Sequence, residues 1–236
     1  MHHCHPTSVV LPRAAKAFTL IELLAVIVVI AILAVLAGPF ARGMVAKANT
    51  AVSQSNMRQL YSFFQMYAAD HNYALPIGSY RDASQLFAWD KSLAEYASNP
   101  QDFFKVLHSP ADKVKRIWPD KNPRTYAMVR AGGYGAYSEY QRNIITRFTK
   151  VEKKAETLLL VEFAHPLNVV FGDSAAIIDT PNQQLEYGST MYGGRFVYLF
   201  MDGHVEFLNP SQTTGTGSLA VPRGAWCITP PNVITN

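Results

Sequence analysis

The sequence predicts an α+β protein in which one long N-terminal helix packs against a small antiparallel β-sheet. Two observations support this fold class. In the first third of the chain, a long apolar run passes directly into an amphipathic segment with helical spacing. Between residues 125 and 208, short apolar runs alternate with turn residues, which is the pattern of strands joined in a sheet.

A nearly uninterrupted apolar run occupies the N-terminal region. Residues 23–37 contain no polar side chain, and across residues 18–40 only Thr19 and Glu22 interrupt the apolar sequence. A helix of about 20 apolar residues can cross the hydrocarbon core of a bilayer. A segment in lipid must be helical, because lipid offers its backbone no hydrogen-bond partners. We therefore predict a transmembrane helix over residues 18–40.

The acidic residue of this segment, Glu22, needs an explanation. A carboxylate inside a membrane is costly and usually has a functional partner there, although Glu22 could also simply lie at the depth of the lipid headgroups. The residues before it favour a functional role. Arg13 and Lys16 form a short basic leader, and Ala17 is a small residue directly before Phe18.

The string FTLIE at residues 18–22, with a basic residue shortly upstream, resembles the processing site of type IV pilins and type II secretion pseudopilins. The resemblance implies that a prepilin peptidase removes residues 1–17 by cutting between Ala17 and Phe18, and then methylates the new amine. Gly is usual before the cut, so Ala17 is a departure. The resemblance also implies that Glu22 neutralises the N-terminal amine of a neighbouring subunit, since opposite charges in a low dielectric offset each other's desolvation.

A helix-breaking pair, Gly38 and Pro39, follows the apolar run, with Pro39 21 residues after Phe18. Pilins have a proline at the same spacing; a proline kinks or locally melts a helix, or it marks the membrane exit. Apolar residues then recur at intervals of three to five, which predicts an amphipathic helix within residues 41–76 that continues into the head. Together these segments predict one helix from about Phe18 to Asp70.

The segment 77–208 is predicted to form the α+β head. A short helix is expected over residues 84–97, and strands are expected over residues 125–130 and 157–163. Asp202 and Gly203 lie between two apolar runs and predict a hairpin, because both residue types accept positive φ. The tail, residues 209–236, is rich in Ser, Thr, Gly and Pro and is predicted to be loosely ordered except around Trp226 to Ile228.

Several head segments resemble one branch of the pilin-like proteins, which ends in a motif of a histidine, nine residues and Asp-Gly. The hairpin around Asp202 and Gly203 matches the end of that motif, but Tyr192 replaces the histidine. Ser109 similarly occupies a position where this branch commonly has Cys, and Tyr126 lies in a segment similar to its Ser-Tyr-x-Met strand. The Asp-Gly pair is therefore interpreted as a hairpin turn without a chemical role.

Composition argues against several function classes. The net charge is +4, but removing a leader with two basic residues and no acidic one leaves 19 basic against 17 acidic side chains, so no nucleic-acid partner is inferred. Cys4 lies in the leader, which leaves Cys227 without a partner for an intrachain disulfide. The cluster at residues 2–5, His-His-Cys-His, also precedes the predicted cut, and no metal or cofactor is predicted.

Enzymatic interpretations find little support in the sequence. Residues 172–174, Gly-Asp-Ser, resemble the nucleophile block of GDS-type esterases, but no Asp-x-x-His pair follows to supply the acid and base. The scattered histidines lack metal-ligand spacing. Four acidic residues could contribute to a calcium site like those of some pseudopilins, although no loop has the alternating oxygen ligands of such a site; they are Asp173, Asp179, Glu186 and Asp202.

The sequence therefore predicts a non-enzymatic prepilin-like subunit of a type IV pilus or a type II secretion pseudopilus. Its expected partners are other copies or related pilin subunits, the prepilin peptidase, an inner-membrane assembly platform and membrane lipid. The expected location is the bacterial inner membrane, with one span and an extracytoplasmic head, or a periplasmic or cell-surface filament. Two alternatives are a secretory signal cleaved after Ala37 and an uncleaved anchor with a binding domain that does not polymerise.

Overall fold

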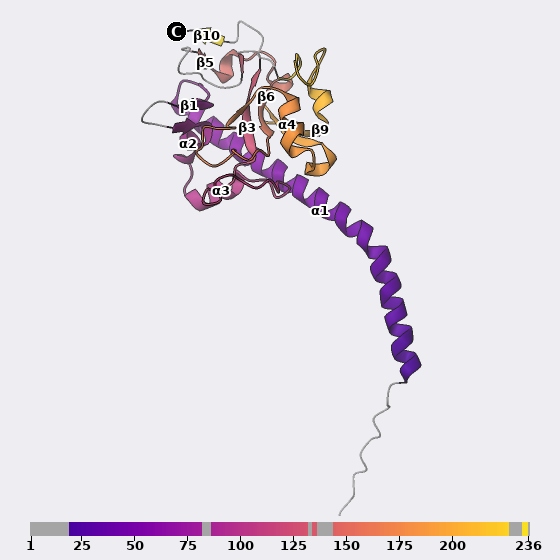
Figure 1. The fold of residues 1–236 in the computed structure, drawn as a ribbon. Helices are drawn as coiled ribbons and strands as arrows, with labels where there is room; N and C mark the ends of the chain where they lie inside the picture. The colour runs from indigo at the N-terminus through magenta and orange to yellow at the C-terminus, as the bar shows by residue number, and fades with distance from the viewer. Residues whose placement is uncertain (1–18, 82–85, 132–133, 136–143, 227–232, 236) are drawn as a thin grey trace, which may run out of the picture. The chain divides into compact units, whose positions relative to one another are not determined.

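A computed structural model describes residues 19–81, 86–131, 134–135, 144–226 and 233–235 (Figure 1). The chain divides into an N-terminal unit, Met1–Met44, and a head unit, Val45–Asn236. Helix α1 (Leu20–Asp70) contributes to both units. The elements that follow it, with η for 3-10 helices, are β1 (Ser79–Arg81), β2 (Leu86–Ala88), α2 (Trp89–Ala94), α3 (Pro100–Val106), β3 (Tyr126–Ala131), β4 (Tyr134–Gly135), β5 (Ile144–Thr146), η2 (Phe148–Lys150), η3 (Lys154–Glu156), β6 (Leu158–Glu162), β7 (Ile177–Ile178), α4 (Pro181–Gly188), η4 (Met191–Gly193), β8 (Phe196–Phe200), β9 (Val205–Leu208), η5 (Pro210–Thr213) and β10 (Val233–Thr235).

Helix α1 agrees with the predicted long helix and ends at Asp70 as expected. The helical assignment continues through Gly38 and Pro39, so the helix does not end at this pair, and a local kink there stays a prediction. The C-terminal end is made by backbone conformation: Asn72 and Tyr73 have φ of 52° and 60°. The Tyr73 N–H then donates to the Ala68 carbonyl over 2.7 Å, which satisfies a carbonyl at the helix end.

The main sheet of the head has six described strands. Five follow the order β4-β3-β6-β8-β9 with antiparallel neighbours. Strand β7 pairs with β3 in parallel, Met128 with Ile177 and Val129 with Ile178, so the prediction of a wholly antiparallel sheet is wrong at this strand. The error has a simple cause: β7 is only two residues long, too short for any periodicity to reveal it.

Smaller parts of the head also differ from the sequence prediction. The helix expected over residues 84–97 is present only as α2, because Leu86–Ala88 forms β2 and pairs with β1. The tail contains regular structure in β10, which pairs with β5, and in η5. The expected order is confirmed at Trp226, whose indole N–H donates to Thr213 over 2.7 Å and whose side chain is buried; residues 227 and 228 lie outside the described residues.

The sheet is the middle layer of the head because apolar side chains cover both of its faces. On one face, Met57, Leu60 and Phe64 of α1 pack with Val197 and Leu199 of β8. Each fully buried side chain of this size contributes roughly 1.5–3 kcal/mol to folding, so this contact anchors the C-terminal half of α1. The opposite face uses the alternate residues of β8 with residues near α4 and η4: Phe196, Tyr198, Phe200, Leu185 and Met191.

The predicted Asp-Gly hairpin is confirmed between β8 and β9, which pair from Leu199–Val205 to Phe196–Leu208. The turn closes through the Gly203 N–H, which donates to the Phe200 carbonyl over 3.0 Å. Gly203 has φ of 95°, whereas Asp202 is not among the described residues with positive φ. Only Gly203 therefore has the positive φ that was expected of both residues. The turn is longer than the two-residue type.

Replacing Gly203 by alanine is expected to lower the free energy of unfolding by about 2–4 kcal/mol. A Cβ at this position would lie 2.5 Å from Cε1 of Tyr61, in addition to the cost of about 1–2 kcal/mol for an alanine with positive φ. Gly193→Ala is the matched control, because Gly193 has φ of 70° but a Cβ added there would meet no atom within 4 Å. Urea unfolding of the full chain in detergent measures both; equal losses would contradict the role of the Tyr61 contact.

Candidate functional site

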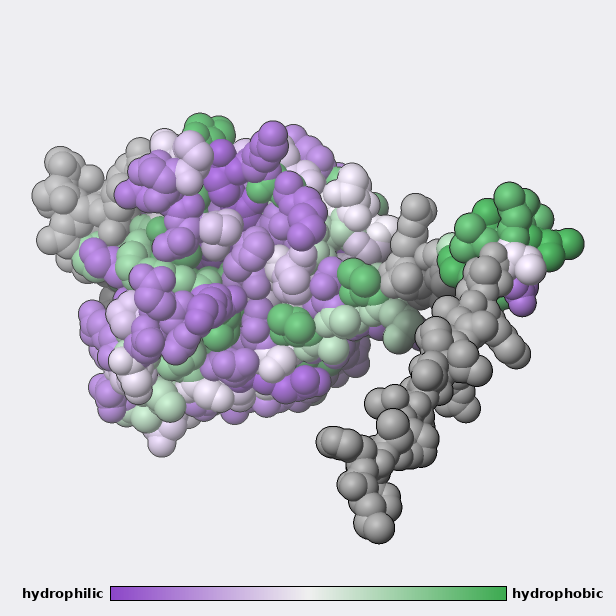
Figure 2. Space-filling view, turned by 90° about the horizontal axis from the view of Figure 1, so that it is seen from below, coloured by the Kyte–Doolittle hydropathy of each residue, from purple (hydrophilic) through white to green (hydrophobic). Residues whose placement is uncertain are grey.

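The N-terminal unit presents an apolar helix surface. Every described side chain from Thr19 to Val35 is exposed, and Figure 2 shows the hydrophobic side chains at this end of α1 as a green group. The exposed fraction of Leu20 is 84% and that of Val35 is 76%. A continuous apolar surface of this kind marks an interaction with membrane or with other protein. Among the described residues, no helix combines the length and the apolarity needed to cross a membrane.

Glu22 lies in the first turn of α1 and forms a capping box with Thr19. The Thr19 N–H and the Thr19 hydroxyl both donate to Oε2 of Glu22, over 2.9 and 2.8 Å. In return, the Glu22 N–H donates to Oγ1 of Thr19 over 3.3 Å. Such reciprocal bonds satisfy backbone donors that have no partner at a helix start. The Thr-x-x-Glu spacing is the sequence signal that could have predicted this motif.

The capping box fixes one oxygen of the Glu22 carboxylate, Oε2, against Thr19. Within the described residues, both bonds from Thr19 reach Oε2. A carboxylate offers about four acceptor positions on its two oxygens, so the held group retains capacity for an ammonium donor. The predicted cleavage residues, Ala17 and Phe18, lie outside the described residues, as do Cys4 and Cys227.

A second polar cluster joins α1 to the sheet inside the head. The Ser53 hydroxyl donates to Oε1 of Glu162 over 2.5 Å and shares a 2.9 Å hydrogen bond with the Tyr126 hydroxyl. Asn56 donates to the same Tyr126 hydroxyl over 3.4 Å. The Val197 N–H donates to the other carboxylate oxygen of Glu162 over 2.8 Å. The four side chains are buried, so these bonds fix α1 against β3, β6 and β8.

Burial makes the carboxyl group of Glu162 a weaker acid than usual. Its side chain is fully buried, and this desolvation raises its pKa to about 7, although the hydrogen bonds from Ser53 and Val197 act in the opposite direction. Charged carboxylates are strongly disfavoured in an apolar interior. The signal that could have identified this residue is a single Glu at the end of the apolar run of β6, Leu158–Glu162.

Three positions from the pilin-like head motifs meet at this cluster. The hydroxyl groups of Ser109 and Tyr192 share a 3.2 Å hydrogen bond, although these residues lie 83 positions apart. Tyr192 has φ of 44°, and burial followed by the nearby Glu162 carboxylate raises its pKa. Tyr126, from the third motif segment, reaches the same carboxylate through Ser53. The contacts therefore show a packing role for these segments.

The remaining sequence candidates do not converge on one metal site. Asp179 pairs with Arg130, with oxygen–nitrogen distances of 2.7 and 3.0 Å, and Asp202 pairs with Nδ1 of His204 over 2.5 Å. In the part of the chain that the structure describes, no group of three or more His, Cys, Asp or Glu residues is placed to hold a metal ion. The histidine and cysteine cluster at residues 2–5 falls outside it.

Comparison with known proteins bears on the N-terminal segment. Residues 12–38 match the prokaryotic N-terminal methylation motif. This motif covers the predicted cleavage position, Glu22 and the first part of α1, and it is consistent with a type IV pilin-like or pseudopilin-like protein. The methylation motif also supports processing as a prepilin-type substrate and N-terminal membrane anchorage. Neither the curated proteins nor the solved structures gave a match to the chain.

Proposed function

We propose that this protein is a subunit of a type IV pilus or of a type II secretion pseudopilus. A prepilin peptidase cuts it before Phe18, residues 18–40 insert into the inner membrane, and an assembly platform adds the subunit to a helical filament. The observation that carries this proposal is the methylation motif at residues 12–38, with Glu22 held at the start of an exposed apolar helix. The head remains on the extracytoplasmic side.

The physical argument for assembly rests on charge and apolar surface together. In an apolar environment Glu22 needs a counterion, and the amine created at Phe18 of a neighbouring copy supplies one. Packing the exposed apolar side chains of α1 against neighbouring helices removes them from water. Because the amine of one subunit meets the carboxylate of the next, the contact is head-to-tail and repeats into an open helical assembly.

Glu22→Ala is expected to leave membrane insertion and cleavage intact but to reduce incorporation into filaments by about tenfold or more. A loss of about 1.4 kcal/mol per contact already corresponds to a factor of ten. The measurement is the amount of subunit in sheared filaments relative to the cell fraction, in a strain that assembles the wild-type protein. Glu152→Ala is the matched control, because it removes an exposed acidic side chain from the head.

Mass spectrometry of the mature N-terminus, combined with the incorporation measurement, distinguishes the proposal from its alternatives. Methyl-Phe18 in both variants, with poor incorporation of Glu22→Ala alone, supports the proposal. Normal incorporation of Glu22→Ala removes the role assigned to the carboxylate. An N-terminus at Met1 identifies an uncleaved anchor with a domain that does not polymerise, and an N-terminus at Gly38 identifies a secreted form.

A further inference from the structure

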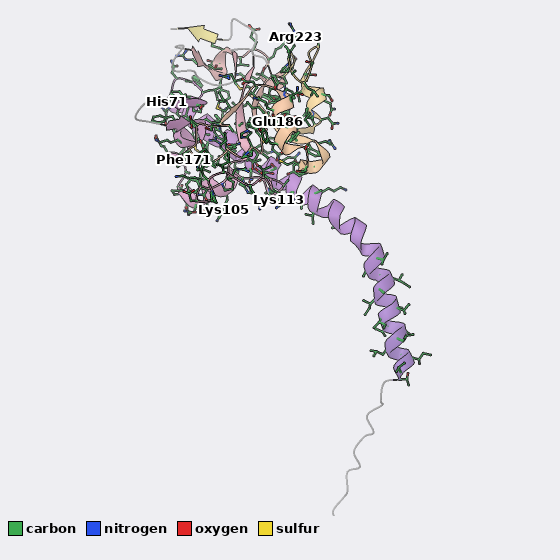
Figure 3. The ribbon with its side chains drawn as sticks, in the orientation of Figure 1. His71, Lys105, Lys113, Phe171, Glu186 and Arg223 are labelled. Carbon is green, nitrogen blue, oxygen red and sulfur yellow. The ribbon has the colours of Figure 1, made fainter. Side chains whose placement is uncertain are left out.

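The head contains a cavity of about 380 Å³ lined by residues of the head alone. Its walls come from Phe104 of α3, the loop 118–122 and the loop 169–174. This volume is within the range of small-molecule sites in proteins, about 300–1,000 Å³. Figure 3 labels Phe171, one of the wall residues, and Lys105, which follows the wall residue Phe104 in α3.

Aromatic rings form a large part of the cavity wall. The rings of Phe104 and Phe171 pack edge to face, with centroids 5.7 Å apart and an interplanar angle of 76°. Trp118 also lines the cavity and is 41% exposed, whereas Trp89 and Trp226 are almost fully buried. An exposed tryptophan beside two phenylalanines offers flat apolar surface to a ligand.

The wall that carries Phe171 is held in a strained conformation. Phe171 has φ of 60°, which is costly for a side chain of this size. Its N–H donates to Oδ2 of Asp90 over 2.8 Å, and the next carbonyl, Gly172, accepts a 2.9 Å hydrogen bond from Arg124. Asp90 and Arg124 themselves form a fully buried ion pair, 2.7 Å apart. The interior therefore fixes the loop before any ligand binds, which lowers the ordering cost of binding.

The charged groups that line the cavity are two carboxylates, Asp120 and Asp173, and one ammonium group, Lys121. Asp120 and Lys121 are adjacent, exposed and of opposite sign. The Asp173 carboxylate interacts electrostatically with the buried Arg124 guanidinium. A phosphorylated ligand would need more cationic groups than Lys121 alone. The lining has one carboxylate in excess, so the choline arm of the test below separates an organic cation from an uncharged ligand. An uncharged ligand with several hydroxyl groups can bond to these polar groups without a counterion, and Asn122 and Ser174 are further hydrogen-bonding groups.

We propose that this cavity binds a neutral saccharide. A pyranose ring combines an apolar C–H face, which packs on aromatic rings such as that of Trp118, with hydroxyl groups that bond to Asp120, Asn122 and Ser174. The site belongs to the head and is independent of filament assembly. It would give the exposed part of the protein the ability to contact glycan.

The test uses the full chain in a polyoxyethylene detergent, because glucoside and maltoside detergents carry the chemistry being probed. The probes are maltose, cellobiose and N,N′-diacetylchitobiose, each titrated to about 50 mM while tryptophan emission and saturation-transfer NMR are recorded. We expect saturable binding of at least one probe, with a Kd of about 1–10 mM for a small preformed site. Because the other two described tryptophans are buried, the emission change reports on Trp118.

Trp118→Ala should weaken that binding by at least fivefold, and Asn122→Ala provides a second, milder variant at an exposed position. Tyr187→Ala is the matched control, since Tyr187 is 37% exposed and does not line the cavity. The proposal is overturned if no probe binds saturably, or if Trp118→Ala and Asn122→Ala bind as the wild type does. Binding of choline chloride in place of the sugars would also overturn it, in favour of a site for organic cations.

Discussion

Replacing Asp90 by alanine is expected to lower the free energy of unfolding of the head by about 3–5 kcal/mol. Both side chains of the Asp90–Arg124 pair are 0% exposed, so the variant leaves a guanidinium buried without its carboxylate. The Phe171 N–H, at a backbone position with positive φ, also loses its acceptor. Removing one member of a buried charge pair is far more costly than removing both, because the remaining charge stays desolvated.

Chemical unfolding of the full chain in detergent measures this loss. Asp102→Ala is the matched control: it removes the carboxylate of a 2.8 Å pair with Lys105 whose side chains are 66% and 78% exposed, so we expect a loss of at most about 1 kcal/mol. The double variant Asp90→Leu/Arg124→Met should be more stable than Asp90→Ala. If Asp90→Ala costs no more than Asp102→Ala, the buried pair does not hold this region together.

The second large effect concerns pH. Glu162 has a pKa raised to about 7 in the folded head by burial, against an ordinary value of 4.5. The folded state therefore binds this proton more tightly than the unfolded state, and the contribution of Glu162 to stability falls as pH rises from about 4.5 through 7. The full change is on the order of 3 kcal/mol, since one pKa unit corresponds to about 1.4 kcal/mol. In the wild-type protein, this contribution to the free energy of unfolding should therefore decrease as pH rises from 5 to 8.

Two histidines change the stability of the head with pH in the opposite direction to Glu162, over part of the same pH range. Burial lowers the pKa of His108 and of His165 below 6.5, so the stability that they contribute at neutral pH is lost as pH falls. We therefore compare the free energy of unfolding of wild type with that of Glu162→Gln at each pH. The histidine contributions cancel in this difference. That difference in the free energy of unfolding should change by about 2.5 kcal/mol between pH 5 and 8, with wild type gaining relative to the variant at low pH.

Glu162→Gln suits this measurement because an amide can still accept from the Val197 N–H and donate to Ser53. The matched control is Glu156→Gln, which makes the same chemical change at a side chain that is 69% exposed. Urea unfolding at pH 5, 6, 7 and 8 gives the four free energies for each protein. Parallel pH curves for wild type and Glu162→Gln would show that the buried carboxylate does not titrate as inferred.

The sequence predicted those parts of the fold that depend on local pattern. The helical spacing of apolar side chains predicted the second half of α1, and the weak helix formers from Asp70 onward predicted its end. The apolar runs located β3 and β6. The Asp-Gly pair located the β8–β9 hairpin. The position of Glu22 near the start of an apolar helix was also evident, although the hydrogen bonds from Thr19 were recognised only in the structure.

Features that depend on contacts between distant segments could not be predicted in this way. Strand β7 forms because Ile177 and Ile178 meet β3, and β2 replaces the first turn of an expected helix because β1 offers a pairing edge. The strained Phe171 is held by Asp90, which accepts from its N–H, and by Arg124, which donates to the carbonyl of the next residue, Gly172, both from elements far away in the chain. No local pattern contains that information.

By itself, the amino-acid sequence determined that an apolar helix with one acidic residue, within an N-terminal methylation motif, precedes an α+β head. These properties follow from hydrophobic periodicity and short motifs, whose energetics are local to a few turns or residues. Only the tertiary structure decided that Glu162 is a buried acid, that Ser109 and Tyr192 touch, and that three aromatic residues surround a cavity. Burial and long-range hydrogen bonding set those properties, and both arise only when the sheet, α1 and the loops pack together.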